Sequence, residues 1–358
     1  MMARKLSRRD FLKWSAFGLA SLAFRPMASK TALSSPPLYN YEQFEGEDLA
    51  RIAIESVSVY SEPSDKSNIL YQRYRDELVN VYYDIVSEYG PGYNPLWYRV
   101  WRGYIHSGHL QKVNVQLNPV LSSIPEGGQL AEVTVPVTQS LRYTSYSGWE
   151  SLYRLYYQSV HWIIAVEEGP DGEAWYKLED ELDRHYVYYV PASHLRPVTA
   201  QELEPISPDV PFEKKRIEVS IAQQTLTAYE NDKVVMHTKI SSGMPQATPP
   251  PGQTSTDTPR GEFNIQSKMP SKHMGDGNLT ADLNAYELPG VPWVCFFEPE
   301  NGVATHGTYW HTNYGTTMSH GCVNMRPEEA KWIYRWTTPA ATVDSWETRG
   351  YGTRVIVY

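Results

Sequence analysis

The most reactive residues of the sequence lie close together along the chain. Cys322 directly follows Ser319, His320 and Gly321, and His306 lies 16 residues earlier. A thiolate attacks carbonyl carbons, and a histidine within hydrogen-bond reach can remove the proton of the thiol. A small residue beside the nucleophile lets backbone N–H groups approach the oxygen that becomes an oxyanion. These residues alone therefore indicate a cysteine acyltransferase or a cysteine peptidase.

Other chemistry for the same residue types is less well supported. The second cysteine, Cys295, lies in an apolar stretch and is interpreted as a buried thiol of a strand. A disulfide between Cys295 and Cys322 would block the thiolate, and we do not expect one. Three histidines and a cysteine between positions 306 and 322 are spaced by five, nine and two residues, unlike the paired ligands of structural zinc sites. We therefore expect no metal and no cofactor, and we interpret His311 as a solvated loop residue.

Composition and charge limit the remaining function classes. Aromatic residues make up 13% of the chain, and 27 of the 358 residues are tyrosines, which favour half-buried strands. Together with frequent glycine and proline, this composition predicts a mainly β protein made of several small units. The net charge of −9 argues against nucleic-acid binding.

The basic N-terminal segment has the features of an export signal. The first 29 residues carry a net charge of +5, so the rest of the chain carries −14. Arg8 and Arg9 precede an apolar run of 11 residues, Trp14 to Phe24, which is too short to span a bilayer. Its basic and apolar parts resemble a twin-arginine signal, which implies export of the folded protein to the cell envelope. Residues 1–29 are interpreted as this signal and 30–48 as a linker; an uncleaved signal would act as a membrane anchor.

An internal repeat occupies residues 49–116 and 131–199. The copies share a Trp-Tyr pair and a later His-Leu pair, which begin at Trp97 and His109 in the first copy and at Trp175 and His194 in the second. Each copy is also predicted to begin with a valine-rich strand, at 57–60 and 133–137. The pattern is similar to bacterial SH3-like domains, which implies two small β-barrels. Their aromatic residues favour barrel cores and a spacer role, although contact with wall polymer stays open.

Residues 215–358 are predicted to form a β-sandwich-like domain with one or two short helices, and this domain carries the reactive residues. Alternating apolar residues predict strands at 216–221, 225–229 and 234–240, and a final strand at 353–358. A helix is expected to begin at Arg326, because proline and two glutamates follow it. Proline and glycine mark residues 244–259 and 266–290 as irregular flaps over the cleft.

Five separated blocks make residues 215–358 resemble the L,D-transpeptidase catalytic domain, also called the YkuD domain. The blocks occur in the order that is typical of the family. They are the Gln224–Tyr229 strand, the Ser242–Gly243 strand end, the Thr258–Phe263 segment, His306–Thr308 and Ser319–Met325.

The resemblance implies a reaction on the stem peptides of peptidoglycan. A cysteine thiolate attacks the carbonyl of the third residue of a tetrapeptide, and D-Ala leaves. The side-chain amine of another stem resolves the thioester, which cross-links two third-position residues. Acylation by carbapenems is also expected of the family. Two alternatives stay open: an L,D-carboxypeptidase or D-amino-acid exchange enzyme using the same site, and a non-catalytic wall-binding protein.

The same resemblance implies roles for individual residues. Cys322 is the nucleophile, His306 is its base, and the carbonyl oxygen of Gly307 orients the His306 ring as the third member of a triad. His320 shapes the oxyanion site or binds the stem. The backbone N–H groups of Gly321 and Cys322 are candidate donors to the oxyanion.

Three further positions are implied to support the loop or the substrate. Ser319 is expected to hold the loop by hydrogen bonding. Many family members carry arginine two residues after the cysteine, where this chain has Asn324. The asparagine can still form hydrogen bonds, but it removes a cation that could pair with a carboxylate of the stem. Arg326, two residues further on, is the candidate to replace that charge.

Overall fold

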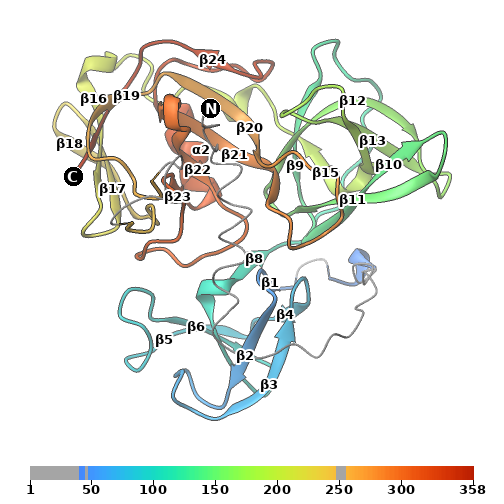
Figure 1. Cartoon of the computed structure of the whole chain (residues 1–358), viewed down its shortest axis with the longest axis horizontal. Helices are drawn as coiled ribbons and strands as arrows, with labels where there is room; N and C mark the ends of the chain where they lie inside the picture. Colours follow the sequence, from blue (N-terminus) through green and yellow to red (C-terminus); the bar gives the residue numbers. More distant parts are fainter. Residues whose placement is uncertain (1–39, 45–46, 247–254) are drawn as a thin grey trace, which may run out of the picture.

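The computed structural model describes residues 40–44, 47–246 and 255–358 (Figure 1). The predicted signal and most of the predicted linker lie outside the described residues, so the structure does not bear on them. The described residues form five β-sheets and one α-helix, which confirms the prediction of a mainly β protein. None of the helices in this part of the chain is long and apolar enough to cross a membrane.

The first unit consists of two small sheets. One has the strand order β4-β1-β8 and the other β3-β2-β7-β6-β5. Most buried apolar residues of these strands form one cluster, while Leu49 and Val113 join the core of the second unit. The strands are β1 (Leu49–Ile52), β2 (Ser56–Tyr60), β3 (Ile69–Tyr74), β4 (Leu78–Asn80), β5 (Tyr83–Val86), β6 (Leu96–Val100), β7 (Gly103–His106) and β8 (Leu110–Val113).

The second unit is a single antiparallel sheet with the order β11-β10-β14-β13-β12-β9-β15. Its strands are β9 (Gln129–Val133), β10 (Val137–Thr144), β11 (Gly148–Tyr156), β12 (Val160–Glu168), β13 (Ala174–Glu179), β14 (Val187–Pro191) and β15 (Leu195–Pro197).

The repeated residues take matching places in the two units. Trp97 lies in β6 and Trp175 in β13, and both are buried. His109 and His194 each end a short 3-10 turn, η2 (Ser107–His109) and η3 (Ala192–His194), that leads into the last strand of its unit. The assignment of both units as SH3-like barrels stays a prediction.

The strand predicted at 133–137 is wrong in its bounds. Strand β9 ends at Val133 and β10 begins at Val137, so the valine-rich run covers the connection between them. Pro136 has no N–H group to donate to a ladder, and the N–H of Thr134 instead donates to the carbonyl oxygen of His194. The alternation of valines therefore indicated the ends of two strands rather than one strand.

The third unit contains two five-stranded sheets and the helix α2 (Pro327–Trp336). The sheets have the orders β18-β17-β16-β25-β19 and β23-β22-β21-β20-β24. Their strands are β16 (Lys215–Ser220), β17 (Thr225–Glu230), β18 (Lys233–Lys239), β19 (Gly261–Asn264), β20 (Ser267–Gly275), β21 (Glu287–Glu298), β22 (Val303–Gly307), β23 (Val323–Met325), β24 (Thr348–Arg349) and β25 (Arg354–Val357). Buried residues of both sheets and of α2 form one core.

Local sequence explains the helix and the first hairpin of this unit. Helix α2 begins with Pro327, whose missing N–H would have no partner there, and has two glutamates in its first turn. Its apolar residues Ala330 and Ile333 fall on one face and enter the core. Asn231 and Asp232 have positive φ angles of 46° and 66°, as a tight turn between β17 and β18 requires.

The predicted flap over residues 266–290 is wrong for its first part. Residues 267–275 form the regular strand β20, which pairs with β21. Pro270 is tolerated because β20 pairs with β24 only through Ser267 and Lys268, so the next residues have no ladder partner on that side. The stretch between β20 and β21 is irregular, as predicted.

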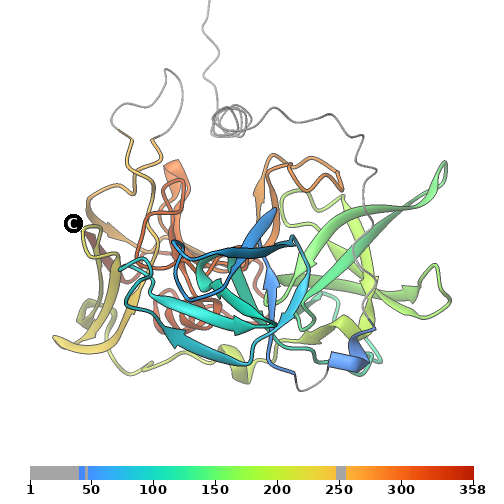
Figure 2. The ribbon, with the colours of Figure 1, turned by 90° about the horizontal axis from the view of Figure 1, so that it is seen from below.

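The three units meet around the sheet that contains β20 to β23. Figure 2 shows the first unit, in blue to cyan, lying across the boundary between the other two. The hydroxyl of Thr312 donates to the carbonyl oxygens of Ser107 and Leu110 at 2.7 and 2.9 Å, which joins the first unit to the third. Strand β12 of the second unit packs against β20 and β21.

Candidate active site

Two short strands bring the reactive residues together. Strands β22 and β23 pair in parallel, with His306 beside Asn324. Side chains two residues apart along an extended chain point to the same side, so Cys322, just before β23, shares a face with Asn324. His306, Cys322 and Asn324 consequently line one cavity of about 940 Å³, together with Ser319 and His320.

The geometry of His306 suits a proton acceptor. Its Nδ1 donates to the carbonyl oxygen of Gly307 at 3.0 Å, as the sequence led us to expect. This bond fixes the hydrogen on Nδ1 and leaves the lone pair on Nε2. Burial lowers the pKa of His306 to about 4, so the ring is neutral near pH 7.

The thiol of Cys322 is half-buried in mostly apolar surroundings. Its Sγ lies 3.4 Å from the carbonyl oxygen of Gly302, which immediately precedes β22. Phe296 and Trp310 belong to the same apolar cluster, and Trp310 also lies beside the His306 ring, with 5.9 Å between ring centroids. Both cysteines are free thiols, so no disulfide links Cys322 to Cys295.

Hydrogen bonds hold the loop that carries Cys322. The Ser319 hydroxyl donates to the carbonyl oxygen of Cys322, which places Ser319 in the supporting position that was predicted. The same hydroxyl oxygen accepts the N–H of Gly321 at 3.3 Å. Thr258 donates to the carbonyl oxygen of Gly321 at 2.9 Å. The N–H of Gly321 is therefore directed at Ser319, and of the two predicted oxyanion donors the N–H of Cys322 is the better candidate.

Gly321 has a backbone conformation that other residues rarely adopt. Its φ angle is +118°, and it is buried beside Cys322. We expect Gly321→Ala to lower the free energy of unfolding by about 1–3 kcal/mol. Because the loop must shift to relieve the strain, we also expect turnover to fall by about 100-fold.

Urea unfolding and an assay of the D-Ala release that the family resemblance implies would measure these two effects. Gly92→Ala is the matched control, because Gly92 has an ordinary φ angle and a Cβ there would meet no atom within 4 Å. Equal stability and activity of Gly321→Ala and the wild type would contradict the assigned strain.

Arg326 is not brought into this cavity. Its Nη1 donates to the hydroxyl of Thr238 at 3.2 Å, and its guanidinium lies 4.7 Å from the centre of the Tyr314 ring. It lines a second cavity of about 370 Å³ instead. Arg326 is therefore not placed to replace the missing cation.

His311 is buried, contrary to the interpretation as a solvated residue. Its Nδ1 accepts the N–H of Asn313 at 3.2 Å, and its Nε2 lies 2.9 Å from the side-chain amide of Asn324. Burial lowers the pKa of His311 to about 3, which keeps the ring neutral. The ring thus fixes the orientation of the Asn324 amide at the cavity wall. The position of His311, five residues after His306, is the sequence feature that marks it, but this spacing does not indicate burial.

The cavity also has walls from the other two units. Arg51 and Arg75 of the first unit and Tyr156 of the second line it. Arg51 donates to the carbonyl oxygen of Tyr309 at 2.8 Å and forms an ion pair with Asp76 at 2.9 Å. These residues could not be predicted from the sequence, since no motif surrounds them and they are far from Cys322 in the chain.

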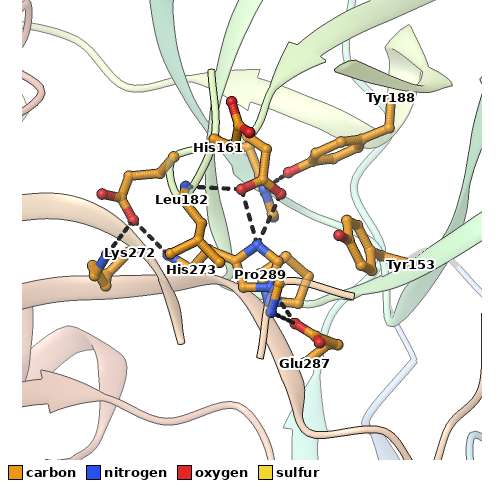
Figure 3. Close-up of polar contacts among 12 residues, drawn as sticks. Tyr153, His161, Leu182, Tyr188, Lys272, His273, Glu287 and Pro289 are labelled. Carbon is orange, nitrogen blue, oxygen red and sulfur yellow. Dashed lines mark hydrogen bonds and ion pairs between the residues drawn. The ribbon is translucent and has the colours of Figure 1, made fainter. Parts of the chain in front are cut away.

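A buried ionic cluster joins the second unit to the sheet beside the cavity (Figure 3). Nδ1 of His273 lies 2.8 Å from Asp180, and its Nε2 lies 2.9 Å from Glu287. Lys272 forms an ion pair with Glu181 at 2.7 Å. Burial alone would lower the pKa of His273, but the two carboxylates raise it to about 9. The histidine is therefore protonated near pH 7 and connects β20 and β21 with the end of β13.

Comparisons with known proteins agree on the third unit. Residues 214–357 match the family model of the L,D-transpeptidase catalytic domain, YkuD. The chain is 30% identical over 128 residues to L,D-transpeptidase 1 of Mycobacterium tuberculosis. This match covers 32% of the chain and 43% of that protein, so the chain spans less than half the length of this relative.

Solved structures of L,D-transpeptidases also match. The catalytic domain of the E. faecium L,D-transpeptidase is 27% identical, with a TM-score of 0.29, and the match covers 41% of this chain and 98% of that one. LD transpeptidase LdtMt1 in complex with imipenem is 19% identical, with a TM-score of 0.30, and the match covers 68% of this chain and 99% of that one. Residues 214–357 thus carry the match to the L,D-transpeptidase catalytic-domain family.

Proposed function

We propose that this protein is an exported L,D-transpeptidase that cross-links peptidoglycan stem peptides through a thioester on Cys322. One observation carries the proposal: His306, oriented by the Gly307 carbonyl, and Cys322 line the same cavity within a domain of this family. Nothing in this arrangement resembles a degenerate site, which disfavours the purely wall-binding alternative.

The proposed acylation step uses the groups described above. Nε2 of His306 takes the proton of the Cys322 thiol, and the thiolate sulfur attacks the carbonyl carbon of the third residue of the donor. The N–H of Cys322 stabilises the oxyanion, and His320 lines the cavity beside it. The bond to D-Ala then breaks, and the proton on His306 passes to the departing amine. A thioester between Cys322 and the donor remains.

Deacylation repeats the proton transfers with a new nucleophile. The side-chain amine of a second stem attacks the thioester carbonyl and gives a proton to His306. The carbon–sulfur bond breaks, and the sulfur recovers its proton from His306. A peptide bond between two third-position residues results. Water or a free D-amino acid in the same place would give the carboxypeptidase or exchange reaction.

The experiment that tests this proposal follows the donor by mass spectrometry. The protein is incubated with a stem tetrapeptide, and released D-Ala, the acyl adduct on the protein and the products are measured. We expect D-Ala, a transient thioester adduct and cross-linked dimer. Hydrolysed tripeptide without dimer would favour the carboxypeptidase, and the absence of both D-Ala and adduct would overturn the enzymatic proposal.

Location and the role of the other units are part of the same proposal. Residues 1–29 direct export by the twin-arginine route, so the protein acts in the cell envelope. The two N-terminal units, proposed as SH3-like, hold the catalytic domain and supply part of its cavity wall. Replacing Arg8 and Arg9 by lysine should retain the protein in the cytoplasm, as cell fractionation would detect.

The low pKa of His306 gives an expectation for pH dependence. The ring must be neutral to accept a proton, and its pKa of about 4 makes it neutral at any pH above that value. We therefore expect the acidic limb of kcat/KM to lie near pH 4 rather than near pH 6.5. Steady-state kinetics from pH 3.5 to 8 would measure it, with tryptophan fluorescence as a check that the protein stays folded. A limb near pH 6.5 would contradict a buried neutral base.

A further inference from the structure

The cavity that holds Cys322 contains more positive than negative side chains. Four basic residues outside the catalytic group line it: Arg51, Arg75, Lys272 and His273. Three of them are already paired with carboxylates. Arg51 pairs with Asp76, Lys272 with Glu181, and His273 with both Asp180 and Glu287.

Arg75 differs from the other three cations. It directly follows β3 and is half-buried, and among the described residues it has no carboxylate within ion-pair distance. Its Nη1 donates to the carbonyl oxygen of Leu283 at 2.6 Å, in the irregular stretch between β20 and β21. A guanidinium has five N–H donors in a planar fork, so this anchor leaves donors that can bind a carboxylate in a bidentate manner.

Arg75 supplies a positive charge that the residues following Cys322 do not bring to the cavity wall. Asn324, two residues after Cys322, is uncharged, and Arg326 lines the second cavity instead. Arg75 reaches the catalytic cavity from the first unit. The attraction between an anion there and the Arg75 guanidinium would be stronger than in bulk water, because the walls of the cavity partly exclude solvent.

We propose that Arg75 is a specificity-determining residue that binds a carboxylate of the donor peptide, away from the carbonyl that reacts at Cys322. This inference rests on the proposed function for the identity of the peptide. It makes the first unit a part of the substrate site rather than a spacer alone. Leu283 fixes the direction of the guanidinium, so the site selects for the position of the carboxylate as well as its charge.

Binding to a Cys322→Ala variant tests the proposal without turnover. Isothermal titration calorimetry would use the stem tetrapeptide and versions of it with each side-chain carboxylate amidated in turn. We expect Arg75→Gln to weaken binding of the free-carboxylate peptide by about 10- to 100-fold, the range for a charged hydrogen bond. One amidated peptide should bind the protein that retains Arg75 as weakly as the free-carboxylate peptide binds Arg75→Gln. For that amidated peptide, Arg75→Gln should cause no further loss of affinity.

Two variants separate recognition from a structural effect. Arg75→Lys keeps the charge but not the fork, so it should recover part of the affinity for the free-carboxylate peptide only. Arg73→Gln is the matched control, because Arg73 lies in β3, pairs with Glu77 at 3.5 Å and does not line the cavity. We expect no change in peptide affinity for Arg73→Gln.

The outcomes distinguish this inference from the proposed function. Arg75→Gln could weaken binding of the free and the amidated peptides equally, or weaken neither. Either result would overturn the role of Arg75, and D-Ala release by the wild type would still uphold the proposed function. Binding that depends on Arg75 and on one carboxylate, without any D-Ala release by the wild type, would support the site and overturn the function. No binding of any peptide would overturn the inference.

Discussion

Replacing Cys322 by alanine is expected to reduce D-Ala release by at least about 10⁴-fold, because the proposed nucleophile and its thioester are lost together. The fold should remain, since Cys322 is half-buried at the cavity wall rather than in the main core. Quantifying D-Ala by mass spectrometry at equal protein concentration would measure the loss. A carbapenem should add its mass to the wild type and not to this variant.

Cys295→Ala provides the matched control for that experiment. Cys295 is a fully buried thiol in β21, with its Sγ 3.8 Å from the hydroxyl of Thr337. Its removal leaves a small cavity that costs about 1 kcal/mol of stability, but it should retain D-Ala release and the carbapenem adduct. Release of D-Ala by Cys322→Ala would contradict the thioester mechanism. Loss of the carbapenem adduct in Cys295→Ala would indicate that the carbapenem reacts with Cys295 instead of Cys322.

The local contacts of the proposed catalytic residues could be predicted from the sequence because these residues lie in two short blocks. His306 and Gly307 are neighbours in the chain, so the hydrogen bond between them is local. Ser319 lies three residues before Cys322, and its contact with the Cys322 carbonyl is also local. Contacts over a few residues follow from residue types and spacing.

The parts that could not be predicted depend on contacts between distant segments. Arg51 reaches Tyr309 across 258 residues, and the cavity wall from the first unit follows from that docking. His311 is buried because the amide of Asn324 offers it a partner, which no periodic pattern indicates. Pro270 indicated a flap, but its place on the less paired side of β20 made it compatible with a strand.

The buried His273 cluster should make stability depend on pH in a direction opposite to that of most buried histidines. His273 has a pKa of about 9 in the folded state and about 6.5 when unfolded, so the folded protein binds more protons between these values. Its contribution is complete below pH 6.5, falls as pH rises, and is lost above about pH 9. We expect about 2 kcal/mol of stability to disappear between pH 6.5 and 8.

Between pH 6.5 and 8, the pH dependence of stability is expected to come mainly from His273. The pKa values of the buried histidines His161, His194, His306 and His311 are lowered to about 3 or 4, so these residues affect stability only below about pH 6.5. The pKa of buried Lys268 is lowered to about 8, so its contribution changes above pH 8 and has the opposite sign. Urea midpoints at pH 6.5, 7.2 and 8 therefore isolate the His273 effect.

His273→Gln should destabilise the protein by about 3–5 kcal/mol at pH 6.5, because it leaves Asp180 and Glu287 buried without their cation. The variant should also lose the decline between pH 6.5 and 8. His237→Gln is the control, since His237 is exposed on β18 and its side chain hydrogen-bonds to the hydroxyl of Thr227. If His273→Gln keeps the wild-type slope, the pH dependence belongs to another group. If the slope disappears, a protonated histidine between two carboxylates holds the second unit against the catalytic sheet.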